Sequence, residues 1–330
     1  MALLDIAGLS VTLPSAAGPA AALRGIDLSV AAGECLGIVG ESGSGKTMTA
    51  LAVMGLLPEG AHAAGRAVFD GADLLTLDDA ALCRLRGRRI AMVFQEPMTA
   101  LNPLQRIGDQ VAEPLRQHRG LGRRAAREEA LALLERVGIP EPRARLGSYP
   151  HQLSGGQRQR AMIAAALACG PNLLIADEPT TALDVTVQSQ ILDLLVELVE
   201  ERGMALILIS HDLAVIAETC DRAVVLYGGL AVESGPVATL LCRPAHPYTR
   251  ALLAALPQPA AGARLSPTAG SVPQIGGFPA GCPFADRCPI AEERCWRERP
   301  PRSEIDAQHE AACHRLDAAR TLPARPGPAR

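Results

Sequence analysis

Alternating and continuous hydrophobic runs along the chain predict a succession of strands and helices. Apolar and polar residues alternate over Leu9–Leu13 and Ile26–Val30, which predicts two antiparallel strands around a turn rich in Pro, Gly and Ala. The continuous apolar run Cys35–Val39 is typical of a strand buried on both faces. A helix is predicted next, over Thr47–Leu57, and Pro58 ends it.

The second part of the pattern repeats this order of buried strand and helix. Residues 106–147 carry a helical pattern with Arg- and Glu-rich faces, which we interpret as solvated faces. Buried strands are predicted over Ile90–Phe94, Leu173–Glu178 and Ala205–Ile209, and an amphipathic helix over Val185–Arg202. Strands that alternate with helices indicate an α/β fold with a parallel sheet.

The loop after the strand Cys35–Val39 matches G-x-x-x-x-G-K-[ST] at every fixed position. In the order strand, glycine-rich loop and helix, backbone N–H groups and the helix N-terminus point at phosphate oxygens, and Thr47 supplies a hydroxyl for Mg²⁺. The alternative is a chance turn of Gly and Ser, which the full match in this context disfavours. The predicted nucleotide-binding residues are Gly40, Glu41, Ser42, Gly43, Ser44, Gly45, Lys46 and Thr47.

Composition adds one fact about this loop. Among the 32 lysines and arginines of the chain, Lys46 is the only lysine. A compact ammonium can approach two phosphates inside a tight backbone loop, whereas a planar guanidinium is larger and forked. We therefore infer that Lys46 fills a role that arginine cannot fill.

The overall composition narrows the class of protein. Of 330 residues, 48% are hydrophobic but only 2% are aromatic, so we expect an aliphatic core. The net charge of −3 gives no whole-chain signal for nucleic acid binding. The N-terminus lacks a secretory signal pattern, and no apolar run approaches the length of a membrane span, so we expect neither secretion nor a transmembrane helix.

Polar residues follow three of the predicted strands. Gln95 follows the first of them, Asp177 and Glu178 end the second, and His211 comes after the third. In parallel sheets these strand ends face the crevice where ligands bind. Asp177 is suited to hold Mg²⁺, and Glu178 is suited to polarise an attacking water. An acidic helix cap and a structural histidine are the alternatives, but the phosphate loop upstream favours the functional interpretation.

The pentapeptide Leu153–Gln157 opens another predicted helix, over residues 158–169. Its serine and two glycines form a second helix N-terminus that can bind an anion. A generic capped helix would explain the serine and one glycine, but not the whole pentapeptide. The predicted nucleotide contacts here are Ser154, Gly155, Gly156 and Gln157.

Together these motifs resemble the ATP-binding subunit of ABC transporters. All six elements of the family occur in family order within residues 1–240, and the pentapeptide separates this family from other phosphate-loop hydrolases. The matching residues are Gly40–Thr47 (phosphate loop), Gln95 (Gln loop), Leu153–Gln157 (signature), Asp177 and Glu178 (strand end), Ala182–Asp184 (D-loop) and His211 (switch histidine).

The resemblance implies a fold and a division into domains. The fold is the α/β P-loop NTPase fold of ABC nucleotide-binding domains, with an antiparallel β subdomain, a helical subdomain and a small C-terminal extension. The ATP-binding domain is expected over residues 1–240, with the helical subdomain at about 95–168, and the extension over residues 241–330.

The resemblance also implies a mechanism. Two subunits form a head-to-tail dimer, and each ATP with its Mg²⁺ lies between the phosphate loop of one subunit and the Ser154–Gly156 surface of the other. Hydrolysis is then mostly positioning and charge neutralisation. The expected catalytic residues are Glu178, His211 and Gln95, the expected Mg²⁺ contacts are Thr47, Gln95 and Asp177, and a further nucleotide contact is Asp184.

The partners that the resemblance implies are mostly membrane proteins. They are a second ATP-binding subunit in a homo- or heterodimer, two transmembrane permease subunits and an extracytoplasmic solute-binding protein, with no nucleic acid. The chain would then be a peripheral subunit at the cytoplasmic face of the inner membrane.

One departure from the family pattern concerns the adenine base. The family usually stacks adenine on an aromatic residue in an early strand, but no aromatic residue precedes Phe69. Leu13 or a neighbour occupies the equivalent position. Because base–aromatic stacking contributes only ~1–3 kcal/mol and apolar contact can replace it, we expect ATP binding to persist.

The C-terminal part resembles one branch of the family. The segments His246–Leu253 and Asp184–Gln188 are similar to segments of oligopeptide and dipeptide importers, and residues 257–281 are rich in Pro and Gly, as in an extended linker. We therefore expect an importer ATPase for di- or oligopeptides. The alternatives are an importer of nickel or another solute in the same branch, and a soluble ABC ATPase outside transport.

Four of the nine cysteines gather near the C-terminus, with spacings x5, x6 and x17. These spacings lack the C-x2–4-C pair that zinc usually prefers, and the longer gaps suit a 4Fe–4S cluster better. The alternative is chance clustering, which four of nine cysteines in a polar window of 32 residues disfavours. The branch that the chain resembles carries a cysteine pattern of this kind, which implies that cluster, with a redox or regulatory role or the simpler role of a structural clip. His309 and His314 are candidate substitute ligands. The predicted ligands for 4Fe–4S or zinc are Cys282, Cys288, Cys295 and Cys313.

Overall fold

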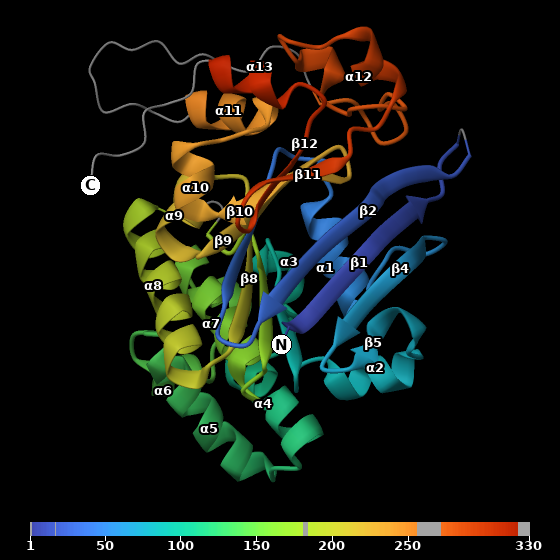
Figure 1. Ribbon diagram of the computed structural model, residues 1–330. Coiled ribbons are helices and arrows are strands. Elements are labelled where there is room, and N and C mark those ends of the chain that lie inside the picture. Colours follow the sequence, from blue (N-terminus) through green and yellow to red (C-terminus); the bar gives the residue numbers. More distant parts are fainter. Residues whose placement is uncertain (1, 17, 181–183, 256–271, 323–330) are drawn as a thin grey trace. The chain divides into compact units, whose positions relative to one another are not determined.

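The computed structural model describes residues 2–16, 18–180, 184–255 and 272–322 (Figure 1). The chain forms two compact units, and each unit is assembled from three separate segments of the sequence. The phosphate loop belongs to the second unit, together with the C-terminal part of the chain. The first unit comprises residues 1–3, 30–35 and 76–209, and the second comprises residues 4–29, 36–75 and 210–330.

Three parallel strands belong to the first unit: β6 (Ile90–Val93), β7 (Leu173–Asp177) and β8 (Ala205–Ser210). β7 pairs in parallel with both β6 and β8. Every residue of these strands is buried, as expected for strands covered on both faces. The three buried strands predicted from the sequence are therefore confirmed to within one residue at each end.

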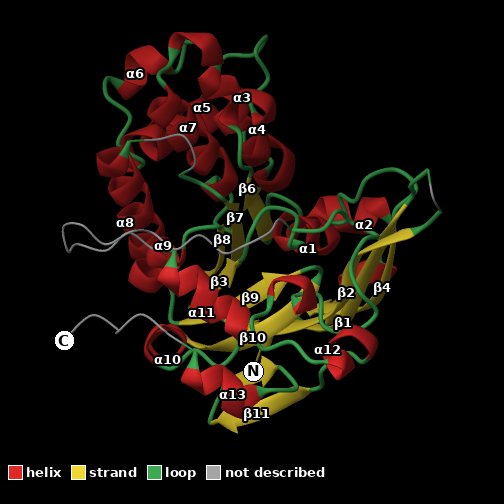
Figure 2. Cartoon of the chain, turned by 90° about the horizontal axis from the view of Figure 1, so that it is seen from above, coloured by secondary structure: helices red, strands yellow, loops and turns green. Residues whose placement is uncertain are grey.

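The helices α4 (Ile107–Arg119), α5 (Arg123–Arg136) and α7 (Gly155–Leu167) pack against one another in the first unit (Figure 2). The helical stretch predicted over residues 106–147 is interrupted, because Gly120 ends α4 in a left-handed conformation (φ 65°) that glycine adopts without strain. Other helices of this unit are α2 (Asp79–Leu85), α3 (Pro97–Ala100), α6 (Pro142–Arg145) and α8 (Val185–Arg202), with a 3₁₀ turn at Pro150–Gln152.

The second unit contains a four-stranded sheet of β1 (Ala2–Leu13), β2 (Ala20–Ala31), β4 (His62–Phe69) and β5 (Ala72–Asp73). The strand order is β2-β1-β4-β5 (Figure 1), and β4 pairs antiparallel with both β1 and β5. The two strands predicted from the N-terminal pattern lie within β1 and β2, which are neighbours in this sheet.

A second set of strands in this unit leads into the phosphate loop. β3 (Cys35–Val39) is buried throughout, as predicted, and pairs in parallel with β9 (Arg222–Tyr227). β10 (Leu230–Pro236) pairs antiparallel with β9, β12 (His309–Ala312) with β10, and β11 (Arg302–Asp306) with β12. Residues beyond position 300 therefore extend the sheet that contains the strand before the phosphate loop.

The helices of the second unit are short. α1 (Lys46–Met54) is shorter than the predicted helix, because Gly55 ends it in a left-handed conformation (φ 64°). The others are α9 (Leu213–Thr219), α10 (Val237–Cys242), α11 (Pro247–Ala254), α12 (Glu293–Arg297) and α13 (Leu316–Thr321), with 3₁₀ turns at Leu74–Thr76 and Ala285–Arg287.

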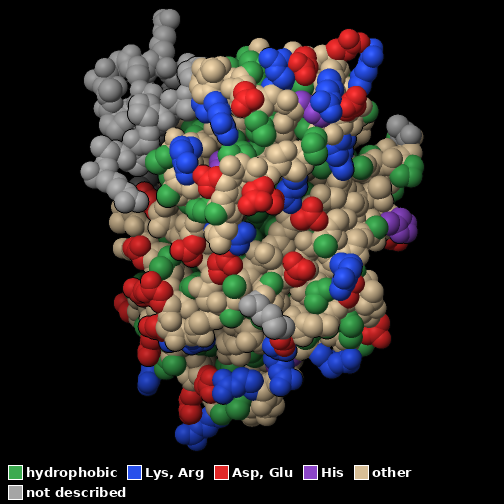
Figure 3. All heavy atoms as spheres, viewed as in Figure 1, with side chains coloured by type: hydrophobic (Ala, Val, Ile, Leu, Met, Phe, Trp, Pro, Cys, Tyr) green, Lys and Arg blue, Asp and Glu red, His purple; other side chains and the backbone are tan. Residues whose placement is uncertain are grey.

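The core is aliphatic, as the composition predicts. Leu, Ile, Val and Ala supply most of the buried side chains. On the face drawn in Figure 3, Arg side chains are interspersed with Asp and Glu. Within the described ranges, no helix combines the length and the apolar character needed to cross a membrane.

Candidate functional site

The phosphate loop owes its path to glycine at three positions. Gly43 and Gly45 have left-handed backbones (φ 79° and 106°), which residues with a side chain rarely adopt. A Cβ atom on Gly40 would lie 2.3 Å from the carbonyl oxygen of Leu226 and 2.7 Å from Ser44 Oγ. The loop can follow this path only with glycine at these positions.

The polar groups of the loop suit an anion. Lys46 is buried, and its Nζ donates hydrogen bonds to the backbone oxygens of Gly40 (2.7 Å) and Glu41 (3.2 Å). Ser44 Oγ is buried and has no hydrogen-bond partner among the residues that the structure describes. Thr47 is exposed in the first turn of α1, where the helix dipole favours negative charge. An ammonium, an orphaned hydroxyl and a helix N-terminus together fit the phosphates of ATP.

The adenine contact expected at Leu13 or a neighbour stays a prediction. Leu13 is the last residue of β1, and its side chain is half-buried. An aliphatic side chain at this place offers apolar contact but no aromatic stacking.

Two residues that the sequence analysis does not single out as site residues contact the loop. The Tyr248 hydroxyl accepts a hydrogen bond from the backbone N–H of Glu41, and Arg287 forms an ion pair with the Glu41 carboxylate. Both residues come from the C-terminal extension. Arg287 carries no local motif, and Tyr248 stands in the segment His246–Leu253 that marks the family branch.

In the first unit, Gln95 and Glu178 contact each other after neighbouring strands. Gln95 Nε2 donates a hydrogen bond to the Glu178 carboxylate at 3.0 Å. Glu178 has φ 46°, a left-handed backbone that costs a residue other than glycine about 1–2 kcal/mol, and its N–H donates to the Ile209 oxygen at 2.9 Å. Asp177, the last residue of β7, is buried. The structure thus brings two of the predicted catalytic residues together and holds one of them in a strained conformation.

His211 directly follows β8 and belongs to the second unit. Its side chain is exposed. The next residue, Asp212, caps α9 by accepting a hydrogen bond from the Ala214 N–H (2.8 Å), and its own N–H donates to Ser210 Oγ (3.0 Å). The second unit therefore contains the phosphate loop, His211 and the four C-terminal cysteines, and the first unit contains the other predicted site residues.

The signature pentapeptide starts α7 through a reciprocal capping box. The Gln157 N–H donates to Ser154 Oγ (3.3 Å), and the Ser154 N–H donates to Gln157 Oε1 (3.0 Å). Because of this cap the helix begins at Gly155, earlier than predicted. Ser154 and Gly155 are exposed, and a Cβ atom on Gly156 would come within 3.0 Å of Val187 Cγ1. Packing against Val187 thus explains the glycine at position 156, and the exposed Gly155 leaves the helix N-terminus open.

Asp184 caps α8 through its side chain alone. Its Oδ1 accepts a hydrogen bond from the Val187 N–H at 2.9 Å. Ala182 and Leu183 of the predicted D-loop lie outside the described residues, as do residues 257–271 of the predicted linker.

The four C-terminal cysteines gather around one small cavity of about 10 Å³. Such a cavity has room for about one water molecule, not for a four-iron cluster. Burial raises the pKa of Cys282 to about 12 and that of Cys313 to about 11, so both thiols are neutral in the metal-free chain. In the described part of the chain, which includes all four cysteines, no group of three or more His, Cys, Asp or Glu residues could hold a metal ion. The structure therefore does not support the predicted 4Fe–4S or zinc site at Cys282, Cys288, Cys295 and Cys313.

His309 and His314, the candidate substitute ligands, have other partners. His309 Nε2 lies 2.8 Å from the Glu233 carboxylate, and both side chains are buried. The same carboxylate accepts hydrogen bonds from the N–H groups of Ala245 (2.7 Å) and His246 (2.9 Å). His314 Nε2 lies 3.0 Å from a backbone oxygen. A buried carboxylate that joins β10, β12 and the start of α11 thus accounts for His309.

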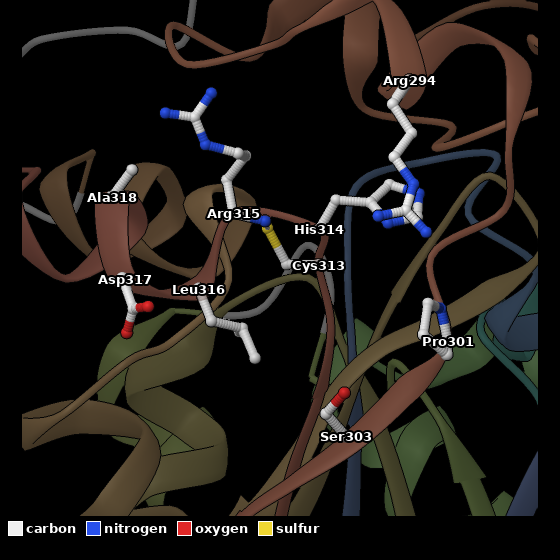
Figure 4. Close-up of a pocket in the computed structure, with 9 residues that line it drawn as sticks. All are labelled: Arg294, Pro301, Ser303, Cys313, His314, Arg315, Leu316, Asp317 and Ala318. Carbon is white, nitrogen blue, oxygen red and sulfur yellow. Dashed lines mark hydrogen bonds between the residues drawn. The ribbon is translucent and has the colours of Figure 1, made fainter.

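An open cavity of about 480 Å³ lies beside Cys313 (Figure 4). Arg294 and Arg315 stand on opposite sides of it in this view. Arg294 forms an ion pair with Glu298, and Arg315 forms one with Glu292. Because carboxylates already match these positive charges, the cavity does not indicate a binding site for an anion.

Comparison with known proteins gives two family matches and close relatives. Residues 23–181 match the family described as ABC transporter, and residues 232–295 match the oligopeptide/dipeptide transporter C-terminal region. The chain is 48% identical over 316 residues to the dipeptide transport ATP-binding protein DppD of Haemophilus influenzae, which covers 95% of this chain and 96% of that protein. It is 47% identical over 318 residues to the oligopeptide transport ATP-binding protein OppD of Mycobacterium tuberculosis, covering 96% of this chain and 52% of that longer protein.

A solved structure is similar as well. It is an ATP-binding cassette in a dimer described as a post-hydrolysis state bound to ADP and Pi. Its sequence is 31% identical, the TM-score is 0.65, and the match covers 71% of this chain and 98% of that chain. The α/β fold of ABC ATP-binding cassettes, predicted from the sequence, is confirmed. The chain belongs to the ATP-binding proteins of ABC transporters, in the branch that carries the oligopeptide/dipeptide transporter C-terminal region.

Proposed function

We propose that this chain binds and hydrolyses ATP to energise the import of di- or oligopeptides across the cytoplasmic membrane. One observation carries the proposal: the phosphate loop and the signature helix occur together with the C-terminal region of oligopeptide and dipeptide transporters. Relatives named for dipeptide and oligopeptide transport align with nearly the whole chain. No comparable observation favours nickel, another solute or a function outside transport.

We assign the chemistry to the residues that the motifs predict. The loop Gly40–Thr47 binds the phosphates. Thr47, Gln95 and Asp177 contact Mg²⁺. Glu178 polarises the attacking water, and His211 orients the γ-phosphate. The strained backbone of Glu178 and its hydrogen bond to Gln95 support the role of Glu178, since such strain persists where the surroundings hold a residue for its chemistry.

In this proposal a second ATP-binding subunit, identical or different, completes each nucleotide site. Ser154 and Gly155 are exposed at the start of α7, a helix of 13 residues, which favours an anion that comes from outside the chain. The similar cassette of known structure is a dimer. Ser154–Gln157 and Asp184 would then contact the ATP that the partner subunit holds. An isolated chain with an intact phosphate loop should therefore hydrolyse ATP poorly.

The surface around α3 and α7 suits a membrane subunit. Met92, Phe94 and Met162 are among the residues that line a cavity of about 480 Å³. Near it in the sequence, Met98 is 56% exposed and Leu104 is 86% exposed. Large exposed apolar side chains, close in the sequence to residues that line a cavity, favour an interaction surface. We assign it to a transmembrane permease, one of two in the importer, which places the chain peripherally at the cytoplasmic face of the inner membrane; an extracytoplasmic solute-binding protein would deliver the peptide.

The proposed domains follow the same division of labour. Residues 1–240 form the ATP-binding domain, residues 95–168 its helical subdomain, and residues 241–330 the C-terminal extension. The grouping of α4, α5 and α7 within residues 95–168 supports the helical subdomain.

An uptake assay tests the proposed function. A strain that lacks this gene is complemented with the wild-type chain or with Glu178→Gln, and is offered labelled dipeptides, longer peptides or nickel. We expect the wild-type chain to restore peptide uptake and Glu178→Gln not to restore it. If the wild-type chain restored uptake of nickel but not of peptides, nickel would replace peptides as the proposed substrate. Purification with ribosomes or DNA, and without integral membrane proteins, would contradict a transport function.

A further inference from the structure

Glu41, the second residue of the phosphate loop, is held from outside the loop. Arg287 donates two hydrogen bonds to its carboxylate, from Nη1 to Oε2 at 2.7 Å and from Nη2 to Oε1 at 3.1 Å. The two residues are 246 positions apart in the sequence. The Arg287 side chain is only 5% exposed, and that of Glu41 is 28% exposed. A forked and largely buried pair of this kind is stronger and more directional than an exposed ion pair.

Tyr248 holds the same residue through its backbone. The Tyr248 hydroxyl accepts a hydrogen bond from the Glu41 N–H at 2.8 Å. The Tyr227 hydroxyl accepts one from Arg287 at 3.2 Å, and the rings of Tyr227, Tyr248 and Phe284 contact one another at centroid distances of 4.6, 5.2 and 5.4 Å. Burial raises the pKa of both tyrosines, so their hydroxyls stay neutral acceptors. The three rings form an aromatic cluster that fixes Arg287 and Tyr248 in place.

Within the loop, the peptide group of Glu41 sets the position of two phosphate-binding groups. Its carbonyl oxygen accepts hydrogen bonds from Lys46 Nζ at 3.2 Å and from the Ser44 N–H at 3.1 Å. Lys46 is the ammonium of the motif, and Ser44 carries the buried hydroxyl that has no hydrogen-bond partner among the described residues. A displacement of Glu41 therefore moves both groups.

The charge of Glu41 is a second reason for the contact. A carboxylate within the phosphate loop repels a triphosphate, and the repulsion is stronger where the surroundings exclude water. The guanidinium of Arg287 neutralises this carboxylate. Without Arg287, Glu41 would leave an uncompensated negative charge beside the bound nucleotide.

We propose that Arg287 and Tyr248 are positioning residues of the ATPase. They hold Glu41 so that Lys46 and Ser44 keep the geometry that binds the phosphates of ATP, and Arg287 also neutralises the Glu41 charge. The C-terminal extension is thereby a part of the nucleotide site and sets its affinity. The proposal rests on the proposed function in one respect, namely that the ligand of the loop is ATP.

Nucleotide binding by the purified full-length chain, and turnover by that chain together with the second ATP-binding subunit, test this role. Binding of ADP with Mg²⁺ is measured by calorimetry, and ATP hydrolysis gives KM and kcat. Arg287→Ala should raise the Kd for ADP and the KM for ATP about tenfold, because a charge-assisted contact to the loop is lost. Arg287→Lys keeps the charge but not the fork, so its effect should be smaller. Tyr248→Phe keeps the ring, removes the acceptor and should raise the Kd about threefold.

A double variant separates the neutralisation of the Glu41 charge by Arg287 from a general loss of structure. Glu41→Gln in the Arg287→Ala background removes the uncompensated charge and should bring KM back to within about threefold of the wild-type value. If Arg287 served only to fold the extension, Glu41→Gln would give no recovery. Arg297→Ala is the matched control, since Arg297 is an exposed arginine of the same extension paired with Glu293, and its Kd should equal that of the wild type.

The outcomes that refute this role differ from those that refute the proposed function. Wild-type Kd and KM in Arg287→Ala and Tyr248→Phe, with thermal unfolding unchanged, would refute the positioning role. If Arg287→Ala does not fold, the test rests on Arg287→Lys and Tyr248→Phe. An unchanged KM in both variants refutes the positioning role. A wild-type chain that binds neither ADP nor ATP would contradict the proposed function itself, and the positioning role with it.

Discussion

Acid should destabilise the second unit through one buried histidine. His246 is 1% exposed and caps α11, where its Nδ1 accepts a hydrogen bond from the Tyr248 N–H at 3.1 Å. Burial lowers the pKa of His246 from 6.5 to about 4, although the negative charge of Glu233 opposes the shift. The folded chain therefore holds this histidine neutral, as a hydrogen-bond acceptor, and protonation removes the cap.

The sign and size of the effect follow from the two pKa values. The unfolded chain binds a proton at His246 near pH 6.5 and the folded chain only near pH 4, so the unfolded state gains protons first as the pH falls. The contribution is complete above pH 6.5 and is lost as the pH falls from there towards 4. At about pH 5 the loss should be about 2 kcal/mol, from the linkage relation at 1.36 kcal/mol per pKa unit.

Urea unfolding at about pH 7.5 and about pH 5 measures this loss. Trp296, the single tryptophan, lies in the second unit and reports on it by fluorescence. His246→Asn keeps a helix-capping acceptor but cannot be protonated, so its stability should fall by about 2 kcal/mol less than that of the wild type. His62→Asn, an exposed histidine in the same unit, is the control and should follow the wild type. An equal loss in the wild type and in His246→Asn would refute the argument.

Two substitutions test the nucleotide site, and a labelling experiment tests the cysteines. Glu178→Gln should keep ATP binding but lower kcat about 100-fold or more, as loss of a general base does; undiminished hydrolysis would remove Glu178 from its assigned role. Gly40→Ala should cost about 1–3 kcal/mol and abolish ADP binding, because its Cβ would lie 2.3 Å from a carbonyl oxygen; Gly122→Ala, where no atom lies within 4 Å, should leave binding intact. Iodoacetamide at neutral pH should label the exposed Cys83 well before the buried Cys282, whose pKa is raised to about 12 by burial; equal rates would contradict the described burial.

Elements fixed by neighbouring residues could be predicted from the sequence. The strand Cys35–Val39 and the helix Val185–Arg202 have the bounds that the hydrophobic pattern indicates. The path of the phosphate loop follows from its glycines, whose conformation and close contacts allow no side chain. In each case the physical cause lies within a few residues of the feature, so a local pattern carries it.

Helix ends were predicted less well, because a single residue decides them. Gly55 stops α1 before the expected end at Leu57, and Gly120 divides the helical stretch after α4. Ser154 starts α7 three residues before the expected start. These residues act through their left-handed backbone or their capping oxygen, which a hydrophobic period does not register.

Long-range polar pairs could not be predicted at all. The partner of Glu41 is 246 positions away, and nothing near Arg287 in the sequence indicates it. The partner of His309 is Glu233, a carboxylate inside the buried strand β10. The sequence offers one signal, namely Glu233 within an apolar run. A buried carboxylate requires hydrogen-bonding partners, so this signal favours a structural role for His309 over metal binding.

The placement of the aromatic residues shows why such pairs matter in this chain. Four of its eight aromatic residues, Tyr227, Tyr248, Phe278 and Phe284, contact one another beside the phosphate loop. Aliphatic side chains can fill a core, but they can neither accept a hydrogen bond from a loop N–H nor face a guanidinium, as two of these rings do at 5.7 Å. In this cluster, aromatic residues therefore lie where a buried polar group needs a partner, and the role proposed for Lys46, the one lysine of the chain, follows the same logic.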